Sequence, residues 1–96
     1  MEIYIIKQFR FDDECIFGNI SFGNVGFFTY FDKAEDIVKN NIFDLSDDGY
    51  YEYVAIMKVD EGLYSPSQLE YWYHWENDKY VECERPKEVE HYFFTI

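Results

Sequence analysis

The alternation of hydrophobic and polar residues predicts a strand early in the chain and a hairpin after it. Residues 2–9 carry Ile and Tyr on both alternating faces, which is typical of a strand covered on both sides near the middle of a sheet. Residues 15–22 and 26–31 also have extended character, and Gly23 and Asn24 between them favour a tight turn. We therefore expect these two segments to pair as a hairpin.

The spacing of hydrophobic residues then changes to that of a helix. Ala34, Ile37 and Val38 fall on one face at helical spacing. Asp32 has the character of an N-cap, and Glu35 stands three residues later, where a capping box places its acid. Two consecutive asparagines follow soon after and favour the end of the helix there. The pattern predicts one short helix.

Strand periodicity returns in two further regions. Residues 50–59 alternate, with Tyr, Ala, Met and Val on one face and Val and Ile among charged residues on the other. A second hairpin is predicted around Asn77 and Asp78, because these residue types tolerate the left-handed backbone of a tight turn. Trp75 then faces Tyr80 across the two strands.

This register separates the two faces of the second hairpin. One face, with Trp72, His74, Val81 and Cys83, has the composition of a core surface. The other face mixes aromatic rings with carboxylates, and its residues are Tyr71, Tyr73, Trp75, Tyr80, Glu82 and Glu84. Because Tyr and Trp dominate binding hot spots, we interpret these six as partner-binding residues on an exposed face. In the alternative interpretation, the helix covers the rings and the glutamates lie at the edge.

The predicted elements together indicate the fold class. After Pro86, residues 87–91 have the length of one helical turn, and residues 92–96 are apolar. A chain of 96 residues has room for one hydrophobic core. We predict a single acidic domain over residues 1–96, of the α+β class, with an antiparallel sheet of about five strands and one short helix packed on one face.

The charge of the chain narrows the classes of partner. Twenty acidic residues against eight basic ones give a formal net charge of −12. Binding to phosphates requires clustered Lys and Arg, so direct binding to nucleic acid or to an anionic membrane surface is disfavoured. A folded acidic surface attracts a basic protein surface instead, such as that of a nuclease or another nucleic-acid-binding protein.

Motifs that would carry chemistry are incomplete. Residues 44–49 match the opening of a calcium-binding loop apart from one Ser, but the closing ligand position holds Ala55, which favours an ordinary turn. His74 and His91 each lack a second ligand at zinc spacing. Cys83 and His74 are a nucleophile and a base on one face, and that face has core composition. We predict no catalytic residue, no metal and no cofactor.

Few features indicate the cellular compartment. The sequence opens with an acid and shows no signal peptide, and no apolar run approaches the ~20 residues of a membrane span. Without a secretion signal, Cys15 and Cys83 are more typical of reduced thiols than of a disulfide. We expect a cytoplasmic protein.

One segment resembles a known pattern. VGFFTYFDKAEDIV, residues 25–38, lies after an N-terminal strand and before YYEYVAIMKVD. It is similar to small bacterial and phage domains of unknown function, in which a strand ending in Gly-x-Phe leads into a short helix with an Ala and then into a strand with alternating aromatics. The resemblance covers about half the chain and implies a small α+β fold. Since those domains have no assigned activity, it implies no functional residue.

These observations favour a non-enzymatic binding protein. Chains of this size, acidity and aromatic content resemble phage or mobile-element inhibitors, including anti-CRISPR and anti-restriction proteins that imitate DNA. The resemblance implies that the chain occupies a basic surface of a nucleic-acid-binding protein. Three alternatives stay open: an immunity protein for a toxin, a small-ligand module with an aromatic pocket, and a structural protein that self-associates, for example as a homodimer.

Overall fold

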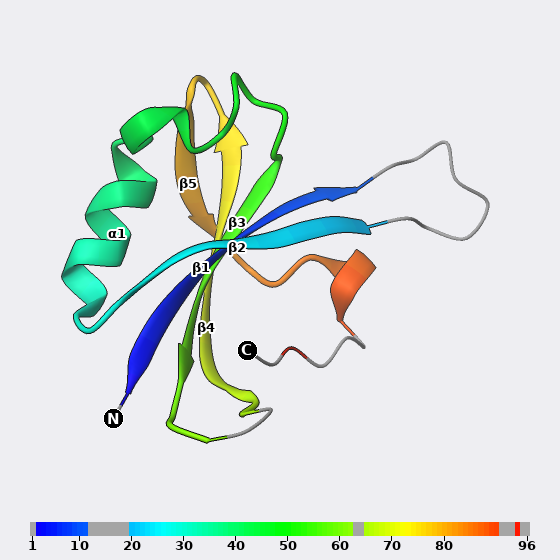
Figure 1. Ribbon diagram of the computed structural model, residues 1–96. Helices are drawn as coiled ribbons and strands as arrows, with labels where there is room; N and C mark the ends of the chain where they lie inside the picture. The colour runs from blue at the N-terminus through cyan, green and yellow to red at the C-terminus, as the bar shows by residue number, and fades with distance from the viewer. Residues whose placement is uncertain (1, 12–19, 63–64, 91–93, 95–96) are drawn as a thin grey trace.

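Five antiparallel strands form one sheet in the order β2-β1-β3-β4-β5 (Figure 1). The computed structural model describes residues 2–11, 20–62, 65–90 and 94. The strands are β1 (Ile3–Phe11), β2 (Ile20–Phe28), β3 (Tyr53–Val59), β4 (Ser67–Glu76) and β5 (Lys79–Cys83). One helix of nine residues, α1, packs against the sheet. The predicted α+β class, with about five strands and one short helix, is confirmed.

The first strand lies near the middle of the sheet, as predicted. β1 lies between β2 and β3, and its side chains are buried on both faces of the sheet. β3 also buries both faces, because Val54 and Ile56 contact the core on one side while Ala55 and Met57 contact the core on the other. Strands that bury both faces are hydrophobic at successive positions, which is the pattern of these two segments.

The predicted hairpin around Gly23 and Asn24 is wrong. β2 runs through both residues without a turn, and it pairs with β1 along its length. The register shifts there because Val25 is an extra residue, which makes a β-bulge. Gly suits a bulge as well as a turn, so composition alone did not separate the two. The expected strand start at residues 15–19 lies outside the described residues.

The helix confirms its predicted face but not its predicted cap. α1 (Phe31–Lys39) buries Ala34 and Val38, and Ile37 packs against the same core. The helix begins one residue before Asp32, its N-cap is Tyr30, and no side chain caps it. Asp32 therefore lies within the first turn, where a carboxylate interacts favourably with the helix dipole.

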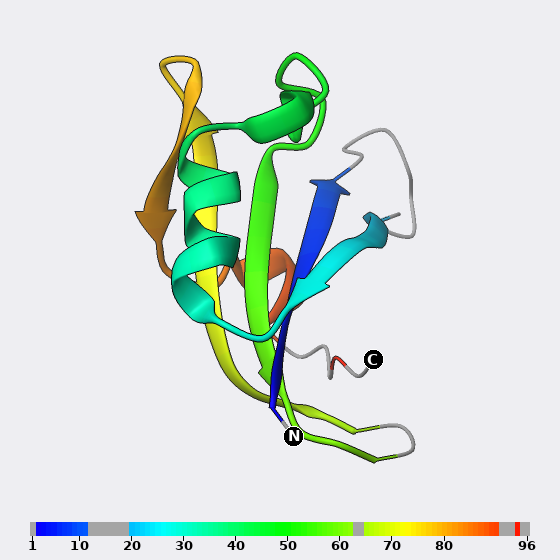
Figure 2. The same ribbon diagram turned by 60° about the vertical axis from the view of Figure 1, so that its left-hand side comes forward.

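Two hydrophobic cores lie on opposite faces of the sheet. Figure 2 shows α1 in front of the sheet and the short 3-10 helix η2 (Lys87–Val89) behind it. The buried residues on the α1 side are Ile6, Ala34, Val38, Leu45, Val54, Ile56, Tyr73 and Tyr80. Those on the opposite side are Phe9, Ala55, Met57, Trp72, Val89 and Phe94. The helical turn predicted after Pro86 is confirmed by η2.

The segment between α1 and β3 is an ordinary turn region. It contains the 3-10 helix η1 (Ile42–Asp44), and Phe43 projects fully into solvent with 100% of its surface exposed. The Asp44 carboxylate accepts hydrogen bonds from the side chains of Asn41 and Ser46 and from the Asp48 N–H, at 3.1–3.4 Å. These bonds occupy the carboxylate within its own turn. Within the described part of the chain, every helix falls short of the length and hydrophobicity that a bilayer-spanning helix needs.

Candidate functional site

The register predicted for the second hairpin is confirmed. Asn77 and Asp78 form the turn between β4 and β5, with positive φ angles of 52° and 62°. Trp75 faces Tyr80 across the two strands. A turn with two adjacent positive φ angles matches the twist of the flanking strands. Asn and Asp can occupy it because these residues tolerate the left-handed backbone conformation.

The exposure predicted for the aromatic face is wrong for two of its residues. Tyr73 and Tyr80 are 1% and 3% exposed, because α1 packs over this face. Trp75 is half-buried beside Gly49, whose φ is +85° and where an added Cβ would lie 2.9 Å from Trp75 Nε1. The alternative interpretation, with the helix over the rings and the glutamates at the edge, describes this region. Buried side chains cannot contact a partner while the domain stays folded.

On the other face of the hairpin, Trp72 belongs to the second core as predicted, whereas His74 and Val81 are only half-buried and Cys83 is exposed. Trp72 is buried, and its ring centroid lies 4.8 Å from that of Phe9. His74 stacks on Tyr53, with ring centroids 4.8 Å apart. Cys83 is an exposed residue with a free thiol, and partial desolvation of this thiol, followed by the charges of Glu76 and Glu84, raises its pKa. A raised pKa disfavours the thiolate, which is the nucleophilic form.

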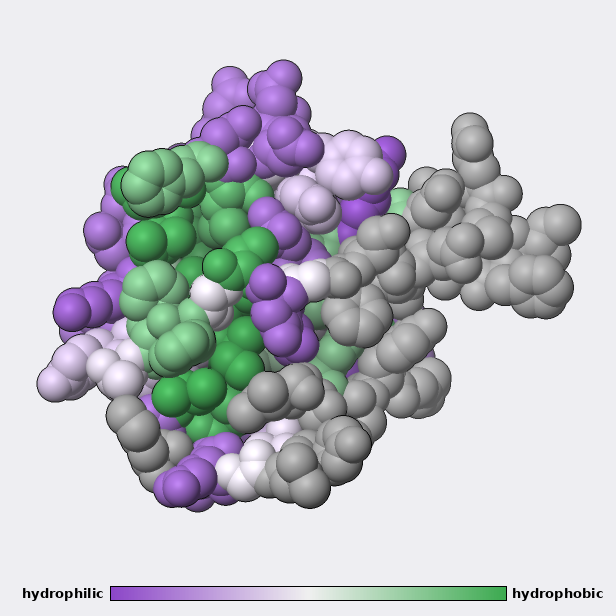
Figure 3. Space-filling view, viewed as in Figure 1, coloured by the Kyte–Doolittle hydropathy of each residue, from purple (hydrophilic) through white to green (hydrophobic). Residues whose placement is uncertain are grey.

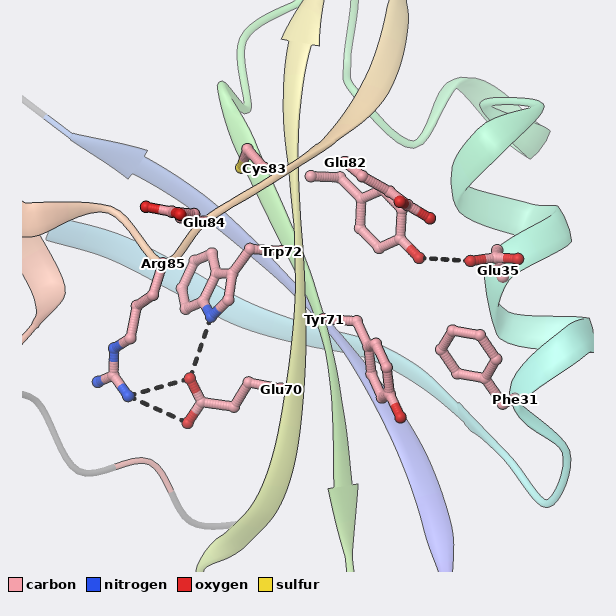
Figure 4. Close-up of a pocket in the computed structure, with 10 residues that line it drawn as sticks. Phe31, Glu35, Glu70, Tyr71, Trp72, Glu82, Cys83, Glu84 and Arg85 are labelled. Carbon is pink, nitrogen blue, oxygen red and sulfur yellow. Dashed lines mark hydrogen bonds and ion pairs between the residues drawn. The ribbon is translucent and has the colours of Figure 1, made fainter.

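The remaining three candidate residues gather around one depression of the surface. Tyr71, which is 37% exposed, and the exposed carboxylates of Glu82 and Glu84 line a hollow of ≈ 630 Å³. It lies where β5 ends and β4 continues, and it is walled by α1 on one side and by residues 84–85 on the other (Figure 4). We call this depression the acidic hollow. Its wall also includes Phe31, Glu35, Glu70 and Arg85.

The α1 wall of the acidic hollow is fixed by a buried tyrosine. The Tyr73 hydroxyl donates a hydrogen bond of 2.8 Å to Glu35 Oε2. Burial, followed by this bond and the charge of Glu35, raises the pKa of Tyr73, so the ring stays neutral and remains a donor. Lys39 lies 3.5 Å from Glu35 and 3.6 Å from Glu82, between α1 and β5. The Glu35 carboxylate is thus held at the rim.

An aromatic pair forms the floor next to this wall. The rings of Phe31 and Tyr71 lie 4.4 Å apart between centroids, and Figure 4 shows both rings on the α1 side of β4. Tyr71 keeps part of its ring in contact with solvent. An exposed ring beside carboxylates can contact both the hydrocarbon stem and the charged end of a long basic side chain.

The opposite wall is a closed network around Glu70. Its carboxylate accepts hydrogen bonds from Arg85 Nη1 at 3.0 and 3.2 Å, from Trp72 Nε1 at 3.0 Å and from Ser67 Oγ at 2.8 Å. Arg85 also donates to the Val89 carbonyl oxygen, at 2.6 and 3.0 Å. The charge of Glu70 is therefore balanced by Arg85, and hydrogen bonds hold both side chains in place.

Four residues of the acidic hollow were missed by sequence reasoning: Phe31, Glu35, Glu70 and Arg85. Glu70 and Trp72 are two residues apart in a strand, so the alternation of side chains could have predicted that they share a face of the sheet. The sequence offered no comparable signal for Glu35, since its approach to Tyr73 depends on how α1 crosses the sheet.

The arrangement is suited to binding a cation. Glu35, Glu82 and Glu84 carry negative charge at the rim, and the floor is aromatic. Among the described residues, no three His, Cys, Asp or Glu side chains are grouped as metal ligands would be. No protein-family model, curated protein or solved structure matches the chain. The resemblance of residues 25–38 to small bacterial and phage domains therefore stays a prediction.

Proposed function

We propose that the acidic hollow holds a Lys or Arg side chain of a basic protein segment, and that the chain is a non-enzymatic binding domain. One observation carries the proposal: Glu82 on the α1 side and Glu84 on the Arg85 side line one hollow, which also contains the partly exposed ring of Tyr71. Charge and ring together fit the two parts of a long basic side chain.

The balance of charge at the acidic hollow supports a cationic ligand. Among the residues that the structure describes, four carboxylates line it and Arg85 is the one basic residue in its lining. Arg85 is paired with Glu70, so three carboxylates keep excess negative charge, offset in part by Lys39 at the rim. A ligand with positive charge gains from these carboxylates, and the net charge of −12 speeds its approach.

We propose a nucleic-acid-binding protein, such as a nuclease, as the partner. The cationic surface of such a protein is built to receive an anionic ligand, and an acidic domain can occupy the same surface. The support is the excess of carboxylates over basic residues, both in the whole chain and at the acidic hollow. The chain would then act as an inhibitor by occupying the surface.

The first experiment measures the affinity of a short arginine-rich peptide by calorimetric titration. The double variant Glu82→Gln/Glu84→Gln should bind about five- to thirtyfold more weakly, since two partly exposed charge pairs contribute up to about 1 kcal/mol each. Tyr71→Ala should also weaken the complex. The matched control is Asp47→Asn/Asp48→Asn, which removes the same charge from two exposed residues outside the acidic hollow.

Equal losses in the two double variants would contradict the proposal, because binding would then depend on net charge and not on this site. The class of partner is tested separately. The immobilised domain is mixed with a bacterial lysate and eluted with duplex DNA or with salt of matched ionic strength. Release of DNA-binding proteins by duplex DNA but not by the matched salt would support a nucleic-acid-binding protein as the partner. Equal release by both eluents would contradict it.

A further inference from the structure

Among the described residues, no strand pairs with the outer edge of β2. β2 is a terminal strand of nine residues, ISFGNVGFF, and it contains no charged residue and no proline. Val25 and Phe27 are 45% and 67% exposed. Figure 3 shows hydrophobic residues gathered where β2 runs towards α1. Natural proteins usually protect an edge strand with Lys, Pro or a covering element, because its open backbone groups pair readily with another strand.

A second hollow adjoins this edge. It has a volume of ≈ 480 Å³ and is lined by Ile3, Ile5, Asn24, Val25, Gly26 and Phe27. Ile5 pairs with Met57 on one side and with Phe27 on the other. Met57 belongs to the core on the face opposite α1, so the apolar hollow lies on that face. The strand edge thus offers both backbone groups and apolar contact area.

We propose that this edge pairs, antiparallel, with the β2 edge of a second copy of the chain. A strand edge that pairs antiparallel with its own copy forms a two-fold interface, in which one patch serves both partners. Such pairing continues the sheet from one copy into the next. The side chains of Val25 and Phe27 from both copies then meet on the same face of the joined sheet.

The distribution of charge favours a second copy over a basic partner at this edge. Each chain carries −12, so two copies can approach closely only where carboxylates are absent. β2 is such a place, and the acidic hollow lies at the opposite end of the strand order. A basic segment would find no carboxylate in β2 to bind. The same lack of charge that makes β2 unsuitable for a basic partner makes it suitable for a copy of itself.

The size of the edge is sufficient. Nine residues of extended chain span about 30 Å, and the molecule measures 20 Å in its smallest dimension. A junction of about 30 Å by about 20 Å covers roughly 600 Å² per copy, which is at the lower end for stable dimers. We expect a dimer that dissociates on dilution.

Dimerisation would place two acidic hollows at the far ends of one continuous sheet. A partner with two basic segments could then bind both, and its second contact would form at high effective concentration. Only this consequence rests on the proposed function, whereas the pairing of the β2 edges does not. The two proposals can therefore fail independently.

The experiment is sedimentation velocity on the whole chain over a wide range of concentration. The mass should rise from 11.7 kDa towards twice that value. Phe27→Lys should remain a monomer at concentrations where the unaltered chain is dimeric, because it places a charge at the junction. Phe43→Lys is the matched control: it makes the same change at a fully exposed Phe outside β2, and it should dimerise normally. Val25→Lys serves in place of Phe27→Lys should that variant unfold.

Added salt separates this proposal from the binding of a basic peptide. Screening reduces the repulsion between two acidic copies, so the dimer should persist or strengthen in salt, while the peptide complex should weaken. A chain that stays monomeric at every concentration would overturn the proposal. So would equal behaviour of the Phe27→Lys and Phe43→Lys variants, whether both dimerise or neither does.

Discussion

The two edges of the sheet use aromatic residues in opposite ways. At the β5 edge, Tyr73 and Tyr80 are buried under α1, and the surface that remains is a rim of carboxylates around Tyr71. At the β2 edge, Phe27 stands in solvent and no charge lies in the strand. The density of aromatic rings along a segment therefore does not locate a binding surface. What decides is which element covers the rings.

The largest expected effect is the difference in stability loss between replacing a buried ring and replacing an exposed one. Tyr73→Ala should lower the free energy of unfolding by about 3–5 kcal/mol, because it leaves a cavity under α1 and removes the donor to Glu35. Phe27→Ala should change it by less than about 0.5 kcal/mol, since that ring is mostly solvated. Urea unfolding at a concentration low enough to keep the chain monomeric measures both. Similar losses would show that the two edges do not differ as described.

Alkaline pH should weaken the α1 side of the sheet. Burial is the main cause that raises the pKa values of Tyr73 and Tyr80 above the usual 10.0. Below pH 10.0 both states keep these tyrosines neutral, and their contribution to stability is fully present. Above it, the unfolded chain releases protons that the folded chain retains, so stability falls by up to about 1.4 kcal/mol per pH unit for each tyrosine.

Urea unfolding at a series of pH values above 10 measures this slope. Tyr80→Phe removes one of the two tyrosines along with its hydrogen bond of 2.7 Å to the Tyr51 carbonyl oxygen. The variant should be less stable at neutral pH but should lose stability less steeply in alkali. An unchanged slope would mean that Tyr80 does not carry the alkaline effect.

The smallest effect concerns the charge at the β5 edge. Lys39→Met should change the free energy of unfolding by less than about 0.5 kcal/mol, because the Lys39 side chain is half exposed and ion pairs at the surface contribute little. It should strengthen the binding of an arginine-rich peptide about two- to threefold by releasing Glu35 and Glu82. Lys33→Met, which makes the same change of charge on α1, is the control. Dimerisation at β2 should be unaffected by either change, and an equal gain in peptide affinity from both would argue against the site.

The sequence was sufficient for the fold class, the helix and the register of the second hairpin, but not for the order of the strands. These depend on local signals: hydrophobic residues at successive positions of β1 and β3, and an Asn77–Asp78 turn that leaves Trp75 opposite Tyr80. Gly23 and Asn24 carried an equally local signal, but it was ambiguous, because the same residues permit a turn or a bulge.

The covered face could not be predicted for a different reason. Alternation assigns Tyr73 and Trp72 to opposite faces, and both residues are buried, although only the face of Trp72 was predicted to face a core. α1 covers one and η2 with Phe94 covers the other, and neither arrangement is encoded in the hairpin itself. The acidic hollow depends on the same crossing of α1, which brings Glu35 to Tyr73.

The contact between the first strand and Phe94 has a consequence for biosynthesis. The Phe9 and Phe94 rings lie 5.4 Å apart between centroids, and the Ser67 N–H donates a 3.0 Å hydrogen bond to the Phe94 carbonyl oxygen. While the chain is still being translated, the core behind the sheet lacks this layer, although β1 emerged from the ribosome first. On a nascent chain, the side chains of Phe9 and Trp72 therefore remain more exposed, and can bind chaperones, until Phe94 has left the exit tunnel.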